Sequence, residues 1–260
     1  MATPNPRSVP RLLDTLRDST RPALIWYGAD GERVELSGHV LDNWAAKTAN
    51  LWVDELDLEA GDVVAVGDEV HWRGLAVALG TWVMGAAVRV VDADGGRAAP
   101  GDRAVVGLVD VRGGLPPLLE RRPPGTQAVL LDRPALSLGR PGGLPGTDVL
   151  DYCAEVRSHA DVYAGLEEPD PDAPALAARG LDGALAHGQL LARAGELAAA
   201  RAGAWGAAAA VHVPGGRMDA GHLLRVLAVL AGGRAAVVTD RDAGEDAWRS
   251  VLAAENAAAF

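Results

Sequence analysis

Hydroxyl and amine side chains are missing from a long part of this 260-residue sequence. No serine, threonine or lysine occurs between Ser158 and Thr239, and Lys47 is the only lysine of the chain. Loops that bind the phosphates of ATP combine such side chains with backbone N–H groups. The stretch therefore lacks a conventional phosphate-binding loop, and we expect that the chain does not use ATP by itself.

Cysteine and positive charge are also scarce. Cys153 is the only cysteine, which excludes an internal disulfide and a zinc site built from several thiolates. The formal net charge of −11 argues against binding to nucleic acids and to anionic membrane surfaces. No apolar run approaches the ~18 residues of a membrane span, and the beginning of the chain does not resemble a signal peptide. The sequence therefore predicts a cytoplasmic protein without nucleic-acid or membrane partners.

What the sequence does contain is aliphatic side chains. Almost half of the residues are apolar, only 4% are aromatic, and seven tryptophans are the bulky members of the expected core. Strand-like apolar runs alternate with helical patterns along the chain, which is typical of right-handed crossovers and a parallel sheet covered on both faces. The predicted fold class is α/β.

Turn signals divide the first half of the chain into short elements. Ser37 is a suitable N-cap for the helix that follows it. Proline- and glycine-rich segments after residue 113 predict long surface loops. The predicted elements are helices at 10–17, 40–52 and 70–84, hairpin strands at 23–27 and 33–36, strands at 63–66, 86–91, 104–109 and 128–131, and a short helix at 148–160.

A second strand–helix series follows the extended linker at 169–174. Its predicted elements are strands at 173–178, 207–213 and 235–239, and helices at 185–201, 220–230 and 245–260. We expect a first α/β lobe at 1–147, with the hairpin and long loops, and a second strand–helix series at 148–260, which the sequence does not separate from one continuous domain.

Three stretches resemble the N-terminal part of the adenylate-forming superfamily, which includes acyl-CoA synthetases and other AMP-binding (ANL) enzymes. The first contains the hairpin, the helix Leu41–Leu56 and the strand entry Gly61-Asp62-Val63-Val64-Ala65. The second is Leu75–Val91, and the third runs from Asp170 through His187-Gly188-Gln189-Leu190 to Asp240. The chain is most similar to a short actinobacterial family of unassigned function with this truncated pattern. The resemblance implies largely parallel sheets with helices on both faces, as in the N-terminal region of an AMP-binding enzyme.

The sequence departs from the superfamily where ATP would bind. The resemblance places the serine-, threonine- and glycine-rich phosphate loop at residues 177–184, which instead contain Arg179, Asp182 and no hydroxyl group. A carboxylate at such a position repels phosphate. The superfamily's catalytic lysine has no counterpart either, because Lys47 lies in an early helix. The resemblance therefore implies an adenylate-forming scaffold that has lost its chemistry.

Other candidate sites are weaker. Ser137 lies in Ala135-Leu136-Ser137-Leu138-Gly139, but nearby prolines argue for a loop serine and against a nucleophile. The six histidines lack the spacing of a zinc site, and Cys153 suits a small core residue. Neither a catalytic residue nor a metal or other cofactor is predicted. The candidate ligand-binding residues are Arg179, His187, which matches the superfamily histidine after the phosphate loop, His212 and Arg217.

The leading hypothesis is a non-catalytic, truncated relative of AMP-binding enzymes that acts by binding another protein, a second copy of itself, or a small ligand. The alternatives are a sensor of nucleotide or acyl-CoA and a ligase-like enzyme that a partner chain completes. His212 and His222 flank a glycine turn and could approach one another, and an ordinary pair of histidines is the simpler interpretation.

Overall fold

The structure is a computed structural model that describes residues 6–28, 31–109, 114–140, 148–165, 168–240 and 244–260. Its strands are β1 (Pro22–Tyr27), β2 (Arg33–Ser37), β3 (Val63–Gly67), β4 (Ala87–Val91), β5 (Ala104–Val109), β6 (Gln127–Asp132), β7 (Val149–Asp151), β8 (Pro174–Ala177), β9 (Leu185–Ala186), β10 (Ala210–Val213), β11 (Ala235–Thr239) and β12 (Ala258–Ala259). Its helices are α1 (Val9–Arg17), α2 (Gly38–Leu56), α3 (Trp72–Val83), α4 (Pro117–Glu120), α5 (Tyr152–Glu155), the 3-10 turn η1 (Val156–Ser158), α6 (His187–Trp205), α7 (Ala220–Ala231) and α8 (Glu245–Ala254).

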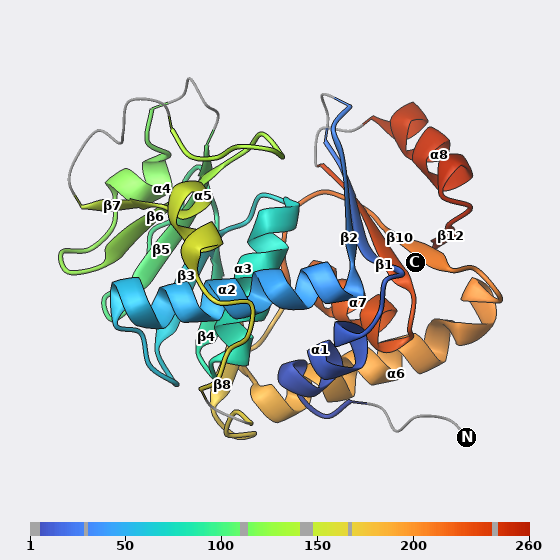
Figure 1. Ribbon diagram of the computed structural model, residues 1–260, viewed down its shortest axis with the longest axis horizontal. Coiled ribbons are helices and arrows are strands. Elements are labelled where there is room, and N and C mark those ends of the chain that lie inside the picture. The colour runs from blue at the N-terminus through green and yellow to red at the C-terminus, as the bar shows by residue number, and fades with distance from the viewer. Residues whose placement is uncertain (1–5, 29–30, 110–113, 141–147, 166–167, 241–243) are drawn as a thin grey trace.

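The strands form two sheets (Figure 1). The first has the order β12-β10-β11-β1-β2, and the second has the order β7-β6-β5-β3-β4-β8-β9. Among the described strands, β1 with β2 and β8 with β9 pair antiparallel, and the other pairs are parallel. The predicted class, largely parallel α/β, is confirmed.

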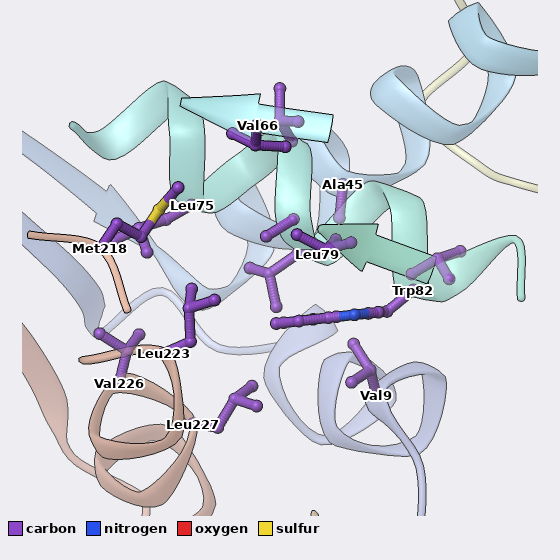
Figure 2. Close-up of a cluster of buried hydrophobic side chains, with 14 of the residues drawn as sticks. Val9, Ala45, Val66, Leu75, Leu79, Trp82, Met218, Leu223, Val226 and Leu227 are labelled. Carbon is purple, nitrogen blue, oxygen red and sulfur yellow. The ribbon is translucent and has the colours of Figure 1, made fainter. Parts of the chain in front are cut away.

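Each sheet is covered on both faces, as expected for parallel strands with continuous apolar runs. α7 packs on one face of the first sheet and Val251 of α8 on the other. α3 packs on one face of the second sheet, and Leu118 and Leu119 of α4 lie on the other. Figure 2 shows the contact between the helices, where α3 side chains Leu75 and Leu79 face Leu223 and Leu227 of α7. All 12 residues of α3 are buried, so this helix is the centre of the main core.

α2 approaches α3 closely because Gly80 has no side chain. A Cβ atom at Gly80 would lie 2.6 Å from Cβ of Thr48 and 2.8 Å from the carbonyl oxygen of Ala45. The Trp52 indole also donates a 3.0 Å hydrogen bond to Oγ1 of Thr81 across the same contact. Ser37 accepts a hydrogen bond from the Val40 backbone N–H at 3.2 Å, which confirms the predicted N-cap of α2.

Two predicted helices are partly wrong. Residues 148–160 begin with β7, which pairs in parallel with the edge of β6, and only α5 and η1 are helical. The predicted helix at 245–260 ends at Ala254, Asn256 takes a left-handed φ of 47°, and Ala258 pairs with Val211 of β10. In both places a distant strand offers backbone hydrogen bonds that a local sequence pattern does not contain.

Each sheet takes strands from both sides of residue 148. β1 and β2 join β10 and β11 in the first sheet, and β8 and β9 extend the second sheet beside β4. The domain boundary between residues 147 and 148 stays a prediction. None of the helices within the described ranges is both long and apolar enough to cross a bilayer.

Candidate functional site at the carboxyl ends of the strands

Charged residues directly follow the parallel strands of both sheets. Asp68 follows β3, Asp92 follows β4, Arg133 follows β6 and Asp240 follows β11. Ligands of open α/β sheets bind at the carboxyl ends of strands, because the helices and loops there leave backbone groups and side chains exposed. We call these four residues, together with Glu69, Arg179 and Arg217, the carboxyl-end cluster.

Arg217 lies at the centre of the cluster. Its Nη1 atom donates to Oδ2 of Asp92 at 2.9 Å and forms a second, very short hydrogen bond with Oδ2 of Asp68. Asp68 also accepts a hydrogen bond from the Ala93 N–H, and hydrogen bonds from the Gly95 and Asp94 N–H groups lower the pKa of Asp92. The hydrogen bond with Asp68 raises the pKa of Arg217. The predicted cation is therefore already bound by two carboxylates of its own chain.

Arg133 connects the two sheets. Its Nη2 atom lies 2.7 Å from Oε1 of Glu69, and its Nη1 atom lies 3.4 Å from Oδ2 of Asp240, which follows β11 of the other sheet. Burial raises the pKa of Glu69, and the Arg133 guanidinium partly offsets that effect. Glu69 also forms a backbone bridge with Arg217, so the two ion-pair groups adjoin.

Arg179 lies on the seven-residue turn between β8 and β9. Its side chain is 68% exposed, and Nη2 is 3.8 Å from Oδ2 of Asp92. The carbonyl oxygen of Arg179 accepts a 3.4 Å hydrogen bond from the N–H of Ala220, at the start of α7. The structure therefore brings two of the candidate residues, Arg179 and Arg217, to one carboxylate.

The other two candidates lie elsewhere. Burial lowers the pKa of His212, whose Nε2 is 3.3 Å from Oγ1 of Thr239 and whose ring lies 5.0 Å from the ring of Trp248. His187 is the first residue of α6, is 4% exposed, and has a pKa that burial lowers. Sequence patterns did not indicate that His187 and His212 lie apart from Arg179 and Arg217. The positions of the two histidines depend on where β9 and β10 join their sheets.

His212 and His222 do approach one another. Burial lowers the pKa of His222 to about 4, and the charge of His212 adds to the decrease. Both rings are therefore neutral near pH 7. The sequence favoured an ordinary pair of surface or half-buried histidines, and the structure corrects this to two buried rings, 1% and 2% exposed.

A buried arginine holds the loop that follows β6, next to the cluster residue Arg133. Arg73 is 2% exposed and donates hydrogen bonds of 2.8 Å to the carbonyl oxygens of Asp132, Pro134 and Ala135. Ser137 lies in this loop and donates to Oδ2 of Asp132 at 2.6 Å, which confirms the predicted loop serine. Neither the arginine nor its three acceptors could be found from sequence spacing, since 59 or more positions separate them.

One group among the described residues has the composition of a metal site. Ligand atoms of Asp132, Asp151 and Cys153 lie within 4.8 Å of one another. Nε of Arg140 is 3.3 Å from Oδ1 of Asp132, and the Arg140 N–H donates to Oδ2 of Asp151 at 2.8 Å. Burial raises the pKa of the Cys153 thiol. The carboxylates are therefore paired with the guanidinium and backbone of Arg140, and the thiol is protonated. These groups form an ion pair at the edge of the core and do not suit a metal ion.

No family model matches the chain. A TIGR03089 family protein from Mycobacterium tuberculosis is 36% identical to it over 174 residues, which cover 66% of this chain and 68% of that protein. This actinobacterial relative agrees with the family that the sequence resembled.

The fold is similar to the N-terminal region of adenylate-forming enzymes. An acyl-CoA synthetase of Brucella canis has a TM-score of 0.74 at 16% identity, over 97% of this chain and 46% of that one. MatB of Rhodopseudomonas palustris has a TM-score of 0.66 at 15% identity, over 96% of this chain and 48% of that one. The nonribosomal peptide synthetase FmoA3 has a TM-score of 0.66 at 19% identity, over 98% of this chain and 25% of that one. The chain thus spans about half or less of the length of these enzymes.

Proposed function

Because this chain belongs to the TIGR03089 family and has the fold of acyl-CoA synthetase N-terminal regions, we propose that it is a binding protein that does not form adenylates by itself. The observation that carries the proposal is the turn between β8 and β9. It corresponds to the phosphate loop in the sequence resemblance, and residues 178–184 contain neither a hydroxyl group nor a lysine. Backbone N–H groups and one exposed arginine are all that it offers to a phosphate.

The charges around this turn also disfavour a triphosphate. The carboxyl-end cluster contains four acids, Asp68, Glu69, Asp92 and Asp240, against three arginines. Two of the arginines, Arg133 and Arg217, already bind carboxylates of the cluster. A phosphate would have to displace these intramolecular partners and approach like charges, which costs several kcal/mol when the groups are partly buried.

ATP–pyrophosphate exchange tests the absence of adenylation. The purified chain, checked for its fold by circular dichroism, is incubated with ATP, magnesium and a panel of carboxylic acids. We expect no exchange above the rate without protein. Exchange that depends on both the acid and the folded chain would contradict the proposal.

One observation favours a second function, the sensing of a nucleotide or acyl-CoA. Arg179 is 68% exposed and lies 3.8 Å from its carboxylate partner, so its guanidinium can turn toward a ligand phosphate at little cost. Calorimetry with ATP, AMP and an acyl-CoA decides between the two functions. Micromolar affinity that Arg179→Met weakens about tenfold, with no effect of Arg193→Met on the exposed side of α6, would favour the sensor.

A partner-completed ligase is the remaining alternative, since 97% of the chain superposes on an acyl-CoA synthetase. This version predicts a stoichiometric partner that brings a lysine-bearing lid domain. Affinity purification from the native host, followed by ATP–pyrophosphate exchange with the complex, tests it. Exchange by the complex and none by the chain alone would support this version.

A further inference from the structure

A positively charged surface lies on α6 and α7, outside the carboxyl-end cluster. Between Leu197 and Thr239 the chain has four arginines and a single acid, Asp219, although its formal net charge is −11. Two of these arginines, Arg201 of α6 and Arg225 of α7, form no ion pair with a carboxylate of the described residues. α6 contacts both α7 and the edge strand β12 (Figure 1). The charge of this region therefore has the opposite sign to that of the whole chain.

Both arginines lie against one aromatic ring. Cζ of Arg201 is 5.6 Å and Cζ of Arg225 is 5.9 Å from the centroid of the Phe260 ring. The ring is itself held in place, because the Phe260 N–H donates to the carbonyl oxygen of His212 at 3.1 Å and the Trp205 ring contacts it edge-on at 5.4 Å. An aromatic ring attracts a cation without removing its charge. The ring therefore positions two guanidinium groups that can still bind an anion.

The other charged groups of the region are already occupied. Oδ1 of Asp219 accepts the N–H of His222 at 2.8 Å and caps α7. Arg234 donates to three backbone carbonyl oxygens and stacks on the Trp205 ring. Among the described residues of this region, Arg201 and Arg225 are therefore the cations without a carboxylate or carbonyl partner.

The exposure of this surface favours an extended ligand. Arg201 and Ala259 of β12 are exposed, and Arg225 and Phe260 are half-buried. Small ligands bind in cavities that enclose most of their surface, so a single small anion gains little here. An extended peptide advances about 3.3 Å per residue, so a segment of a few residues can reach both guanidinium groups. β12 is the outermost described strand of the first sheet, and an open sheet edge accepts an extended segment.

Charge favours a short acidic segment over a second copy of the chain. A second copy brings its whole formal net charge of −11 to the contact and is repelled. A short segment carries only a few carboxylates, and these meet the local positive charge of α6 and α7. The more distant acids of the chain are screened, because the Debye length is about 8 Å at physiological salt.

We propose that the surface of α6 and α7 around Phe260 binds a short, extended acidic segment of a partner protein, whose carboxylates pair with Arg201 and Arg225. This binding does not depend on whether the chain forms adenylates, because none of the three residues belongs to the carboxyl-end cluster.

Binding of model peptides to the full chain tests this surface. The probe is a ten-residue peptide of alternating glutamate and threonine, and the controls are the corresponding glutamine–threonine peptide and inorganic phosphate. Calorimetry measures affinity, and NMR of ¹⁵N-arginine side chains identifies the guanidinium groups that respond. We expect saturable binding of the glutamate peptide, with shifts of the Arg201 and Arg225 Nε–H signals. Both controls should bind at least about fivefold more weakly, and affinity for the glutamate peptide should fall as salt rises.

Two double variants of equal net charge give a matched control. Arg201→Met with Arg225→Met removes both cations of the surface, and Arg97→Met with Arg193→Met removes two other exposed arginines. We expect the first double variant to bind the glutamate peptide about 5- to 20-fold more weakly, which is the value of two exposed ion pairs. The second should change the affinity by less than about twofold, and both should keep the melting temperature of the unchanged chain.

The proposal is overturned if the glutamate peptide does not bind saturably, if the glutamine peptide or phosphate binds as tightly, or if both double variants lose the same affinity. Sedimentation tests the other occupant. A dimer that the unchanged chain forms, and that the variant with Arg201→Met and Arg225→Met does not, would assign the surface to a second copy and overturn the proposal.

Discussion

The carboxyl-end cluster and the pocket between α1 and the start of α6 differ in whether their polar side chains have partners. In the cluster, Arg217 and Arg133 are bound by carboxylates from three different loops. His187 lines a pocket between α1 and the start of α6, and its buried Nε2 atom has no partner among the described residues. Arg179 and His187, one from each region, are only eight positions apart in the sequence.

This difference indicates where a ligand gains binding energy. A ligand at the cluster competes with the ion pairs that Arg133 and Arg217 already form, whereas the buried Nε2 atom of His187 has no competing partner among the described residues. At the edge where open α/β sheets usually bind ligands, two of the three cluster arginines are therefore already paired within the chain. Four measurements test this comparison, from the largest expected effect to the smallest.

Loss of Arg73 is expected to disrupt the loop that follows β6. Arg73→Met removes three hydrogen bonds from a buried cation to carbonyl oxygens, and each such bond is worth about 1.5–3 kcal/mol. We expect the free energy of unfolding, measured by urea denaturation, to fall by roughly 4–6 kcal/mol, which is at the lower end of the sum because the variant also removes the cost of burying the guanidinium charge. Arg193→Met, on an exposed helix position, should change it by less than about 0.5 kcal/mol. A loss below about 1 kcal/mol for Arg73→Met would show that the loop does not depend on this arginine.

Acid should destabilise the protein through the buried histidines beside the cluster. Burial lowers the pKa of His71 to about 3 and that of His222 to about 4, from an ordinary value of 6.5. Below pH 6.5 the unfolded chain binds protons that the folded chain does not, so stability is complete above pH 6.5 and is lost as the pH falls. Each histidine contributes a slope of about 1.4 kcal/mol per pH unit.

Together the two histidines should lower the free energy of unfolding by roughly 3 kcal/mol between pH 6.5 and pH 5, because the slope reaches its full value only below about pH 6. Urea denaturation at a series of pH values measures the slope, and His222→Asn should reduce it by about 1.4 kcal/mol per pH unit. A free energy that stays constant from pH 7 to pH 5 would mean that these rings are protonated in the folded state.

Removal of a cluster arginine should cost more than removal of a pocket arginine. Arg217→Met leaves the carboxylate of Asp68, a residue that is 5% exposed, without its cation, and we expect the free energy of unfolding, measured by urea denaturation, to fall by more than for an exposed pair. Arg11→Met breaks pairs whose side chains are 40–61% exposed, and exposed pairs are worth about 0–1 kcal/mol.

The double variant Asp68→Asn with Arg217→Met isolates the pair. Its loss of stability should be smaller than the sum of the two single losses. Strict additivity, or an equal cost for Arg11→Met and Arg217→Met, would remove the energetic distinction between the two regions.

The N-cap of α1 supports one wall of the pocket. The Ser8 hydroxyl oxygen accepts a 3.3 Å hydrogen bond from the Arg11 N–H, so Ser8→Ala should cost about 1 kcal/mol. Ser8→Asp keeps a capping acceptor and should cost less. Thermal unfolding measures both variants, and equal stability of Ser8→Ala and the unchanged protein would show that the cap contributes nothing.

Several elements followed from local sequence alone. The turn-flanked apolar runs at 23–27 and 33–36 are β1 and β2, and Ser37 caps α2 as predicted. The strands β3, β4, β5, β6 and β11 also lie where short apolar runs predict them. These predictions succeeded because hydrophobic periodicity, turn residues and helix caps depend on residues only a few positions apart in the sequence.

Elements that depend on distant partners were missed. β7 forms because β6 offers an edge, and β12 forms because β10 offers one. Of the four candidate ligand-binding residues, the structure brings Arg179 and Arg217 together at Asp92, while His187 and His212 lie apart from them. No spacing in the sequence contains that grouping, because 125 positions separate Arg217 from Asp92.

The sequence by itself determined which groups the chain can offer: one lysine, one cysteine, and no hydroxyl group or lysine between Ser158 and Thr239 except the phenol of Tyr163. It also determined the α/β class, since apolar periodicity and turn chemistry are local properties. Only the tertiary structure decided which charges neutralise one another. Arg217 meets Asp68 and Asp92, and the Nε2 atom of His187 is left buried without a partner among the described residues. Pairing of this kind depends on the order in which strands from distant parts of the chain join the two sheets. That order brings the carboxyl ends of the strands, and the residues that follow them, side by side.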